Sequence, residues 1–227
     1  MTRSSLFALV VLLAAAAPGA GASSSFCLKG GLSHATILID PDPPIEFDNT
    51  TRFGGGLGFS FGLSPQLTLD LDLLYMMKGA ETEVSYVYGD YEIDAEVKTR
   101  LDYATVSPTL RITPMGERGI YFLGGVEIGY ILRARARVEG SALGISVEQE
   151  EDIKEGLKDV DTSLRVGAGF QFPLGDEGRA FLIEGHYVHS LQDIAEDADA
   201  FTVSDDVPTE EYTAKNRALY IFAGIRL

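Results

Sequence analysis

Hydrophobic and polar residues alternate along much of the chain with a period of two, which is typical of β-strands and not of helices. Every second residue from Ile120 to Val138 is apolar or glycine, while the positions between them include Glu127, Arg133, Arg135 and Arg137. The same alternation recurs at 51–63, at 66–77 and at 217–227. The mature part of the chain is therefore expected to be built from strands.

Eight strands are predicted, at 26–38, 51–63, 66–78, 99–112, 119–138, 161–173, 179–191 and 215–227. The connections between them alternate between long (39–50, 79–98, 139–160, 192–214) and short (64–65, 113–118, 174–178). Antiparallel strands joined alternately by tight turns and long loops are typical of outer-membrane barrels. We predict an all-β fold, a closed, antiparallel up-and-down transmembrane β-barrel of eight strands with both termini on the periplasmic side.

The polarity of the two strand faces decides between a membrane barrel and a soluble carrier barrel, since both have the same period. The apolar face is too continuous to be exposed to water. A Lys or Arg against lipid at the bilayer midplane costs about 2–4 kcal/mol, so the charged face, which includes Lys29, should point inward. We predict a structural ionic network in the lumen, formed by Arg52, Asp70, Asp72, Arg111, Glu127, Arg133, Arg165, Glu184 and Arg226.

Residues 1–22 have the composition of a secretory signal peptide: one Arg, an apolar run, a Pro-Gly break and small residues before a cut after Ala22. The barrel domain is then 23–227. Cys27 is the only cysteine, which excludes an internal disulfide. The net charge of −16 argues against nucleic acid as a partner. No cofactor-binding pattern is present, because the Gly-rich 54–58 lies within a strand and no helix follows it.

Acidic residues concentrate in the four long connections. "DPDPP" at 40–44 and "EQEEDIKE" at 148–155 could supply oxygen ligands for divalent cations such as calcium, although neither has the spacing of a known loop. The alternative is that these charges keep exposed loops solvated. The segment 81–97 alternates on both sides of Gly89-Asp90, which predicts a two-stranded extension above the membrane. Its tyrosines Tyr86, Tyr88 and Tyr91 could form a partner-binding edge.

The chain has three histidines, His34, His186 and His189. His186, Ser190 and Glu184 share the inward face of one predicted strand, which raises the hypothesis of a lipid hydrolase. Residues four apart on a strand are about 13 Å apart, so a serine and a histidine so placed need a partner from another strand. The histidines are too few and too scattered to predict a metal site.

Six blocks of the sequence resemble, in order and spacing, the porin-family outer-membrane β-barrel domain of diderm bacteria. They are "FCLKGGLSHATI", "YATVSPTLRI", "IYFLGGVEIGYILRAR", "TSLRVGAGFQF", "LIEGHYVHSLQDI" and "KNRALYIFAGIRL". The resemblance implies a small eight-stranded barrel inserted by the outer-membrane assembly machinery, with no shared catalytic residues. Members of that family commonly end in an aromatic residue, and Leu227 at this position implies weaker recognition by that machinery. Because the chain has no Trp, we expect the membrane interface to be anchored by Tyr75, Tyr130, Tyr187, Phe170 and Phe172.

These observations predict a non-enzymatic, monomeric, integral outer-membrane protein with a structural or interaction role, in contact with outer-membrane lipid. The interior of an eight-stranded barrel is only wide enough for side chains, which argues against bulk diffusion. A narrow pore or small-solute carrier is the alternative, and a lipid-modifying enzyme is a third hypothesis.

Overall fold

The computed structural model describes residues 24–40, 48–88, 91–114, 119–142, 145–175, 178–195 and 213–227, without the side chains of 83–95 and 141–147. The predicted signal peptide at 1–22 lies outside the described residues, as do 41–47 and 196–212 in two of the long connections. No helix in the described part of the chain is both long and apolar enough to cross a membrane.

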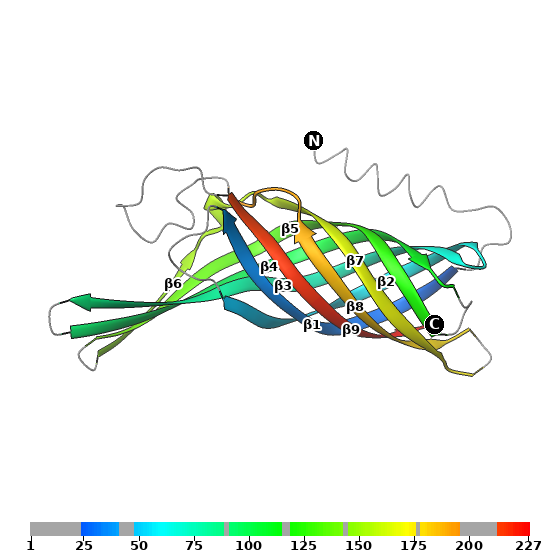
Figure 1. Ribbon diagram of the computed structural model, residues 1–227, viewed down its shortest axis with the longest axis horizontal. Helices are drawn as coiled ribbons and strands as arrows, with labels where there is room; N and C mark the ends of the chain where they lie inside the picture. The colour runs from blue at the N-terminus through cyan, green and yellow to red at the C-terminus, as the bar shows by residue number, and fades with distance from the viewer. Residues whose placement is uncertain are drawn as a thin grey trace.

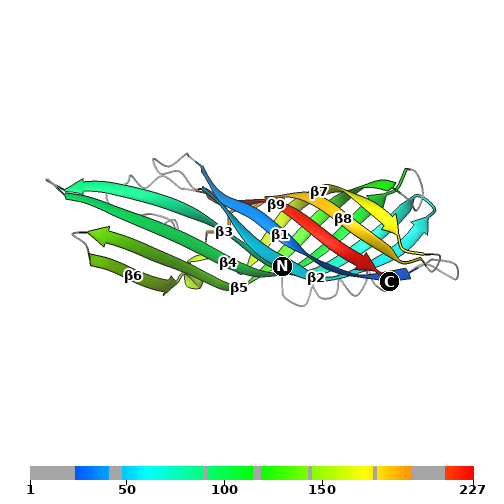
Figure 2. The same ribbon diagram turned by 90° about the horizontal axis from the view of Figure 1, so that it is seen from below.

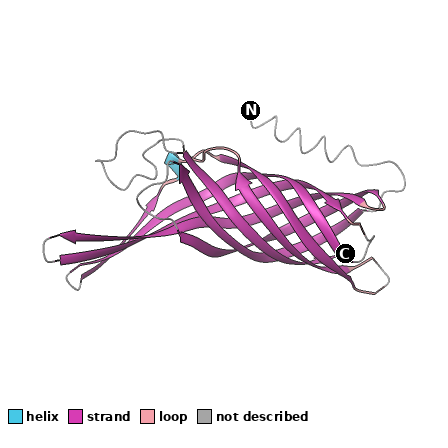
Figure 3. Cartoon of the chain, viewed as in Figure 1, coloured by secondary structure: helices cyan, strands magenta, loops and turns pink. Residues whose placement is uncertain are grey.

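The described residues form one antiparallel sheet of nine strands, of which eight close into a ring (Figures 1 and 3). The ring strands are β1 (Ser24–Asp40), β2 (Asp48–Ser64), β3 (Leu67–Tyr88), β4 (Tyr91–Ile112), β5 (Gly119–Ala142), β7 (Val160–Pro173), β8 (Ala180–Ser190) and β9 (Thr213–Arg226). Hydrogen bonds between β1 and β9, and between β4 and β5, complete the ring. The predicted closed antiparallel barrel of eight strands is confirmed.

The ninth strand, β6 (Ile145–Asp152), pairs with the outer part of β5 beyond the ring. Together β3, β4, β5 and β6 form a four-stranded extension (Figure 2). It projects from the end of the barrel opposite the short turns, which we call the outer end. The predicted two-stranded extension at 81–97 is confirmed, since Glu81 pairs with Lys98 and Tyr88 with Tyr91. The prediction that 139–160 is a loop is wrong. A strand so rich in acidic residues gives a weak sequence signal, and ion pairs with β5 compensate for it.

The outer wall of the ring is apolar. Its exposed side chains include Leu28, Phe53, Leu57, Leu73, Leu110, Phe122, Val126, Leu164, Ile183 and Ile221. The five aromatic residues expected at the membrane interface, Tyr75, Tyr130, Tyr187, Phe170 and Phe172, are all exposed on this wall. Charged residues from β1, β3, β4, β5, β7 and β8 are buried inside the ring. The sidedness inferred from the alternation is the one that the structure has.

A β-bulge in β5 reverses the alternation near its outer end. Asp102 pairs with Arg133 but Tyr103 pairs with Ile131, so Leu132 has no partner on β4. Such an extra residue shifts every later side chain to the opposite face. Ile131 and Ala134 are both fully buried as a result, while Arg133 is exposed. The predicted inward position of Arg133 is therefore wrong.

Pro108 lies within β4 opposite Leu71 of β3. On the other side of β4, pairing with β5 stops at Val106–Ile128 and resumes at Thr109–Gly125 in the same register. Proline cannot donate to the ladder, so it removes bonds locally. The register of this strand is unchanged by it.

A glycine in β7 makes room for a large side chain inside the ring. Gly169 pairs with Tyr121 of β5, and a Cβ at Gly169 would lie 2.4 Å from the Tyr121 ring. Tyr121 is fully buried, and its hydroxyl donates to Glu184 at 2.8 Å. The glycine therefore gives this tyrosine its place across the narrow interior.

Candidate functional site

The middle of the barrel holds a network of buried ion pairs. Lys29 of β1 lies at its centre, with its Nζ 3.0 Å from Asp72 Oδ1 and 2.9 Å from Glu184 Oε2. These residues come from β1, β3 and β8, and their side chains are at most 2% exposed. Each carboxylate that burial removes from water thus has a cation beside it, as buried charges require.

Arg165 of β7 connects this centre to a second carboxylate. Its Nη2 donates to Asp72 Oδ2 at 3.0 Å, and its Nη1 lies 3.8 Å from Glu127 Oε2 on β5. Its Nε donates to His186, whose imidazole is also 3.1 Å from Glu184 Oε2. Arg165 has no exposed surface. One guanidinium therefore links side chains from β3, β5 and β8.

A separate pair lies nearer the short turns. Arg111 donates to Asp70 through Nε at 2.8 Å, with Nη2 at the same distance from that carboxylate oxygen. Ser60 also donates to Asp70, at 2.6 Å. The Arg111 guanidinium lies over the Tyr121 ring, 4.8 Å from its centroid, which connects this pair to Glu184 through the tyrosine hydroxyl.

Toward the outer end, Lys78 is enclosed by acids and aromatic rings. Its Nζ is 3.0 Å from Glu127 Oε1 and 3.7 Å from Asp161 Oδ2. It also lies 4.8 Å from the centroid of the Tyr103 ring. Asn216 then donates to both the Tyr103 hydroxyl and Asp161, each at 2.9 Å. Polar contacts thus continue from β3 and β5 to β9.

Apolar side chains fill the interior beyond Lys78. Ile37, Leu101 and Ile131 belong to a single buried cluster that also includes Leu157 and Ile194 from two of the long connections. The backbone ties these connections together, because Lys158 N donates to Ile194 O and Ile194 N donates to Ala214 O, both at 2.8 Å. The described residues therefore close the outer end of the barrel with hydrocarbon.

Six of the nine residues predicted for the lumen network lie together in the buried interior: Asp70, Asp72, Arg111, Glu127, Arg165 and Glu184. Arg52 is partly exposed, with its Nη2 4.0 Å from Glu81. Arg226 donates to Gln171 at 3.1 Å near the short turns. Arg133 is exposed beyond the bulge.

The sequence prediction missed Lys78, Asp161, His186 and the buried tyrosines as members of this network, and it placed Lys29 only on the polar face. A signal for Lys78 was present, because it lies an even number of residues from Asp70 and Asp72 and therefore on the same face of β3. Asp161 likewise lies four residues from Arg165, on the same face of β7. Both stand near the predicted strand ends, where a period of two is hardest to assign.

The residues of the hydrolase hypothesis are not assembled as a catalytic unit. Ser190 donates to Asp161 Oδ1 at 2.6 Å, while His186 lies between Glu184 and Arg165. All three proposed residues are 1% exposed. A nucleophile needs its base within hydrogen-bond reach, and this serine hydroxyl has an aspartate there instead.

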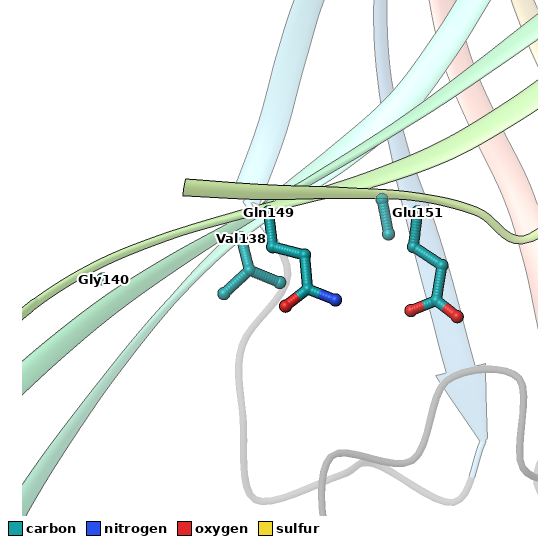
Figure 4. Close-up of a pocket in the computed structure, with 5 residues that line it drawn as sticks. Val138, Gly140, Gln149 and Glu151 are labelled. Carbon is teal, nitrogen blue, oxygen red and sulfur yellow. The ribbon is translucent and has the colours of Figure 1, made fainter. Parts of the chain in front are cut away.

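The acidic stretch 148–155 lies in β6 and the 3-10 turn η1 (Lys154–Gly156). Arg135 Nη1 is 2.6 Å from Glu150 Oε1, and Arg137 Nη2 is 3.0 Å from Glu148 Oε2. A shallow pocket on the β5–β6 hairpin is lined by Ala136, Val138, Gly140, Gln149 and Glu151 (Figure 4). In the described parts of the chain, no group of three or more His, Cys, Asp or Glu residues is placed to hold a metal ion.

Elsewhere in the extension, Lys98 lies 2.7 Å from Glu96 and 3.8 Å from Glu139 of β5. Its hydrogen bond to Glu96 raises the pKa of the Lys98 ammonium above its usual value. The lysine therefore stays charged at neutral pH. Its ion pairs are exposed to water, so each contributes little to stability.

A family model described as outer membrane protein beta-barrel domain matches residues 20–196. The chain belongs to this family. No curated protein matches this outer-membrane barrel. Membership confirms the family resemblance seen in the sequence and indicates the cell outer membrane as its location.

Several solved structures are similar to this outer-membrane barrel, at low sequence identity. Ail, the attachment invasion locus protein of Yersinia pestis, is 14% identical, with 90% of this chain and 99% of that chain covered and a TM-score of 0.42. OprG from Pseudomonas aeruginosa is 15% identical, with coverages of 90% and 96% and a TM-score of 0.40. Neisserial surface protein A is 10% identical, with coverages of 92% and 99% and a TM-score of 0.36.

Proposed function

We propose that this chain is a non-enzymatic outer-membrane protein whose barrel is closed to solutes and whose outer end has a structural or interaction role. The observation that carries this proposal is the filled interior. Lys29, Lys78 and Arg165 are each buried against carboxylates, and apolar residues close the outer end. Eight-stranded barrels have room for little more than such side chains.

The orientation follows from where the connections lie. An even number of strands in the ring brings the start of β1 and the end of β9 to the side of the short turns. Short turns are periplasmic in outer-membrane barrels and longer connections are extracellular. We place the termini in the periplasm, and the four-stranded extension outside the cell.

The proposed partners follow from the two surfaces. The apolar wall contacts outer-membrane lipid, and the protein works as a monomer that the outer-membrane assembly machinery inserts. The extension presents charged strands and the pocket between Val138 and Gln149 to the outside. Divalent cations at the acidic connections stay a prediction, since much of those connections lies outside the described residues.

Conductance across a planar lipid bilayer tests the closed barrel. We expect the refolded protein to leave the bilayer silent, because an ion would have to displace the Lys29 and Arg165 pairs as well as the apolar seal. The boiled, unfolded sample gives the background. Discrete current steps from the folded sample alone would contradict the closed barrel and establish the narrow pore instead.

A second experiment tests the absence of enzymatic activity. In cells that produce His186→Ala or Ser190→Ala, we expect the lipid composition of the outer membrane to equal that of wild-type cells. The proposal would be contradicted if the wild-type protein changed the acyl chains of outer-membrane lipid, relative to cells that lack the protein, and if both substitutions abolished that change. Outer-membrane levels of each variant, measured by gel, control for loss of the folded protein.

A further inference from the structure

Three basic side chains lie next to each other on the outer wall of the barrel, where β8 ends and β9 begins. Lys215 and Arg217 occupy successive outward positions of β9, and Arg217 pairs directly with His189 of β8. Directly opposite side chains on antiparallel strands have Cβ atoms about 4.5–5.5 Å apart. The three side chains therefore form one basic patch, the 189/215/217 patch.

This patch has no acidic partner among the described residues. Neither Lys215 nor Arg217 has a carboxylate within ion-pairing distance there, although most other described cations do, including Arg135 and Arg137. Their neighbours on β1 are Leu38 and Thr36, which carry no charge. The Nδ1 atom of His189 is buried and has no hydrogen-bond partner among the described residues.

The patch lies at one surface of the membrane. The stretch from Arg217 to Leu227 is about as long as the roughly 9–11 residues with which a tilted strand crosses the hydrocarbon layer. Along it, Leu219, Ile221 and Ile225 point outward and are between 47% and 55% exposed. The basic side chains therefore begin where this apolar wall ends, opposite the short turns.

We propose that the 189/215/217 patch binds the phosphate of a phosphorylated lipid in the leaflet at this end of the barrel. An Arg guanidinium offers paired donors that match phosphate oxygens, and a Lys ammonium adds a point charge. The exposed Tyr187 and Leu219, which pair across β8 and β9, continue the wall toward the hydrocarbon layer and can hold an acyl chain. The proposal rests on membrane insertion and on the proposed orientation, and is independent of whether the barrel conducts.

Native mass spectrometry of the refolded full chain in detergent measures this binding. The probes are lipid A with two phosphates and phosphatidylcholine, whose zwitterionic headgroup offers no net charge. We expect lipid A to bind more tightly than phosphatidylcholine. The double variant K215Q/R217Q should weaken lipid A binding roughly 30-fold, because each basic residue near an anionic lipid surface contributes about fivefold.

Two matched variants separate the patch from total charge and from folding. R135Q/R137Q removes two positive charges from the extension and should leave lipid A binding unchanged. K215R/R217K keeps both charges and should retain most of the binding. The slower migration of each variant after boiling, on a denaturing gel, verifies the folded barrel.

Three results would overturn the proposal. Equal binding of lipid A by wild type and K215Q/R217Q would exclude the patch. Equal binding of lipid A and phosphatidylcholine by wild type would exclude selective recognition of an anionic phosphate headgroup. Release of lipid A by inorganic phosphate at equal concentration would show a site for the free anion instead of for a lipid.

Discussion

Arg165 has no exposed surface and contacts carboxylates on two different strands. A buried cation of this kind is not strong evidence for net stabilisation, because removal of both charges from water costs about as much as their attraction returns. Removal of one partner has a much larger effect, since it leaves a charge buried and alone. The interior network is therefore intolerant of single substitutions.

The variant Arg165→Met should lower the free energy of unfolding by about 3–5 kcal/mol, because Asp72 loses one of its two cations and Glu127 is left with Lys78 alone. The free energy of unfolding is measured by titration with urea, and the change in gel migration reports the folded fraction. Arg135→Met is the matched control, since its pair with Glu150 is about half exposed on both sides. We expect less than about 1 kcal/mol there. Equal losses in the two variants would contradict a buried network that matters for stability.

The single extra residue in β5 changes what the strand presents to each side. Before Leu132, Glu127 points inward, and after it Ala134 takes an inward position. The bulge keeps Arg133, Arg135 and Arg137 off the buried side, where Ile131 and Leu101 form the apolar seal. It also brings Arg135 and Arg137 opposite the acids of β6. One insertion in the ladder thus allows the strand to serve both the barrel and the extension.

Deletion of Leu132 should remove the bulge but leave Ile131 and Ala134 inward and Arg133 outward, because these residues then alternate with no extra residue between them. The apolar seal therefore keeps its side chains, and we expect the deletion variant to give nearly the same yield of folded barrel after refolding as wild type. Leu132→Ala is the control, because it keeps the bulge and removes only an exposed side chain. A deletion variant that refolds much less well than Leu132→Ala would show that the bulge does more than set which side chains point inward.

At the scale of the whole molecule, the ring has no free sheet edge within the membrane, which is the condition that a sheet must meet in lipid. The wall that meets lipid is apolar, and most ionised groups are buried in the interior or gathered at the extension, while Lys215 and Arg217 lie where the apolar wall ends. The end of the barrel that carries the extension therefore differs from the rest in charge and in shape (Figures 1 and 2). In the proposed orientation, it is the part that an external partner can reach.

A closed barrel of this kind resists detergent, so the unboiled protein should migrate on a denaturing gel ahead of the boiled protein. The closed ladder of eight strands keeps it compact, whereas the heated chain binds detergent along its length. Arg165→Met should complete the change at a lower temperature than Arg135→Met. Identical migration with and without boiling would contradict the barrel in solution.

The sequence by itself determined the eight strands of the ring, their order, the short turns and the side that meets lipid, because the period of two is a local property of the chain. The alternation also placed each of six charged residues on the inward face of its strand: Asp70, Asp72, Arg111, Glu127, Arg165 and Glu184. Only the tertiary structure decided which of these side chains meet: Lys29 and Glu184 are 155 positions apart, and their contact depends on the closure of the ring through β1, β9 and β8. The same holds for the outward turn of Arg133 and for β6. These depend on register and on cross-strand pairing, which no local pattern contains.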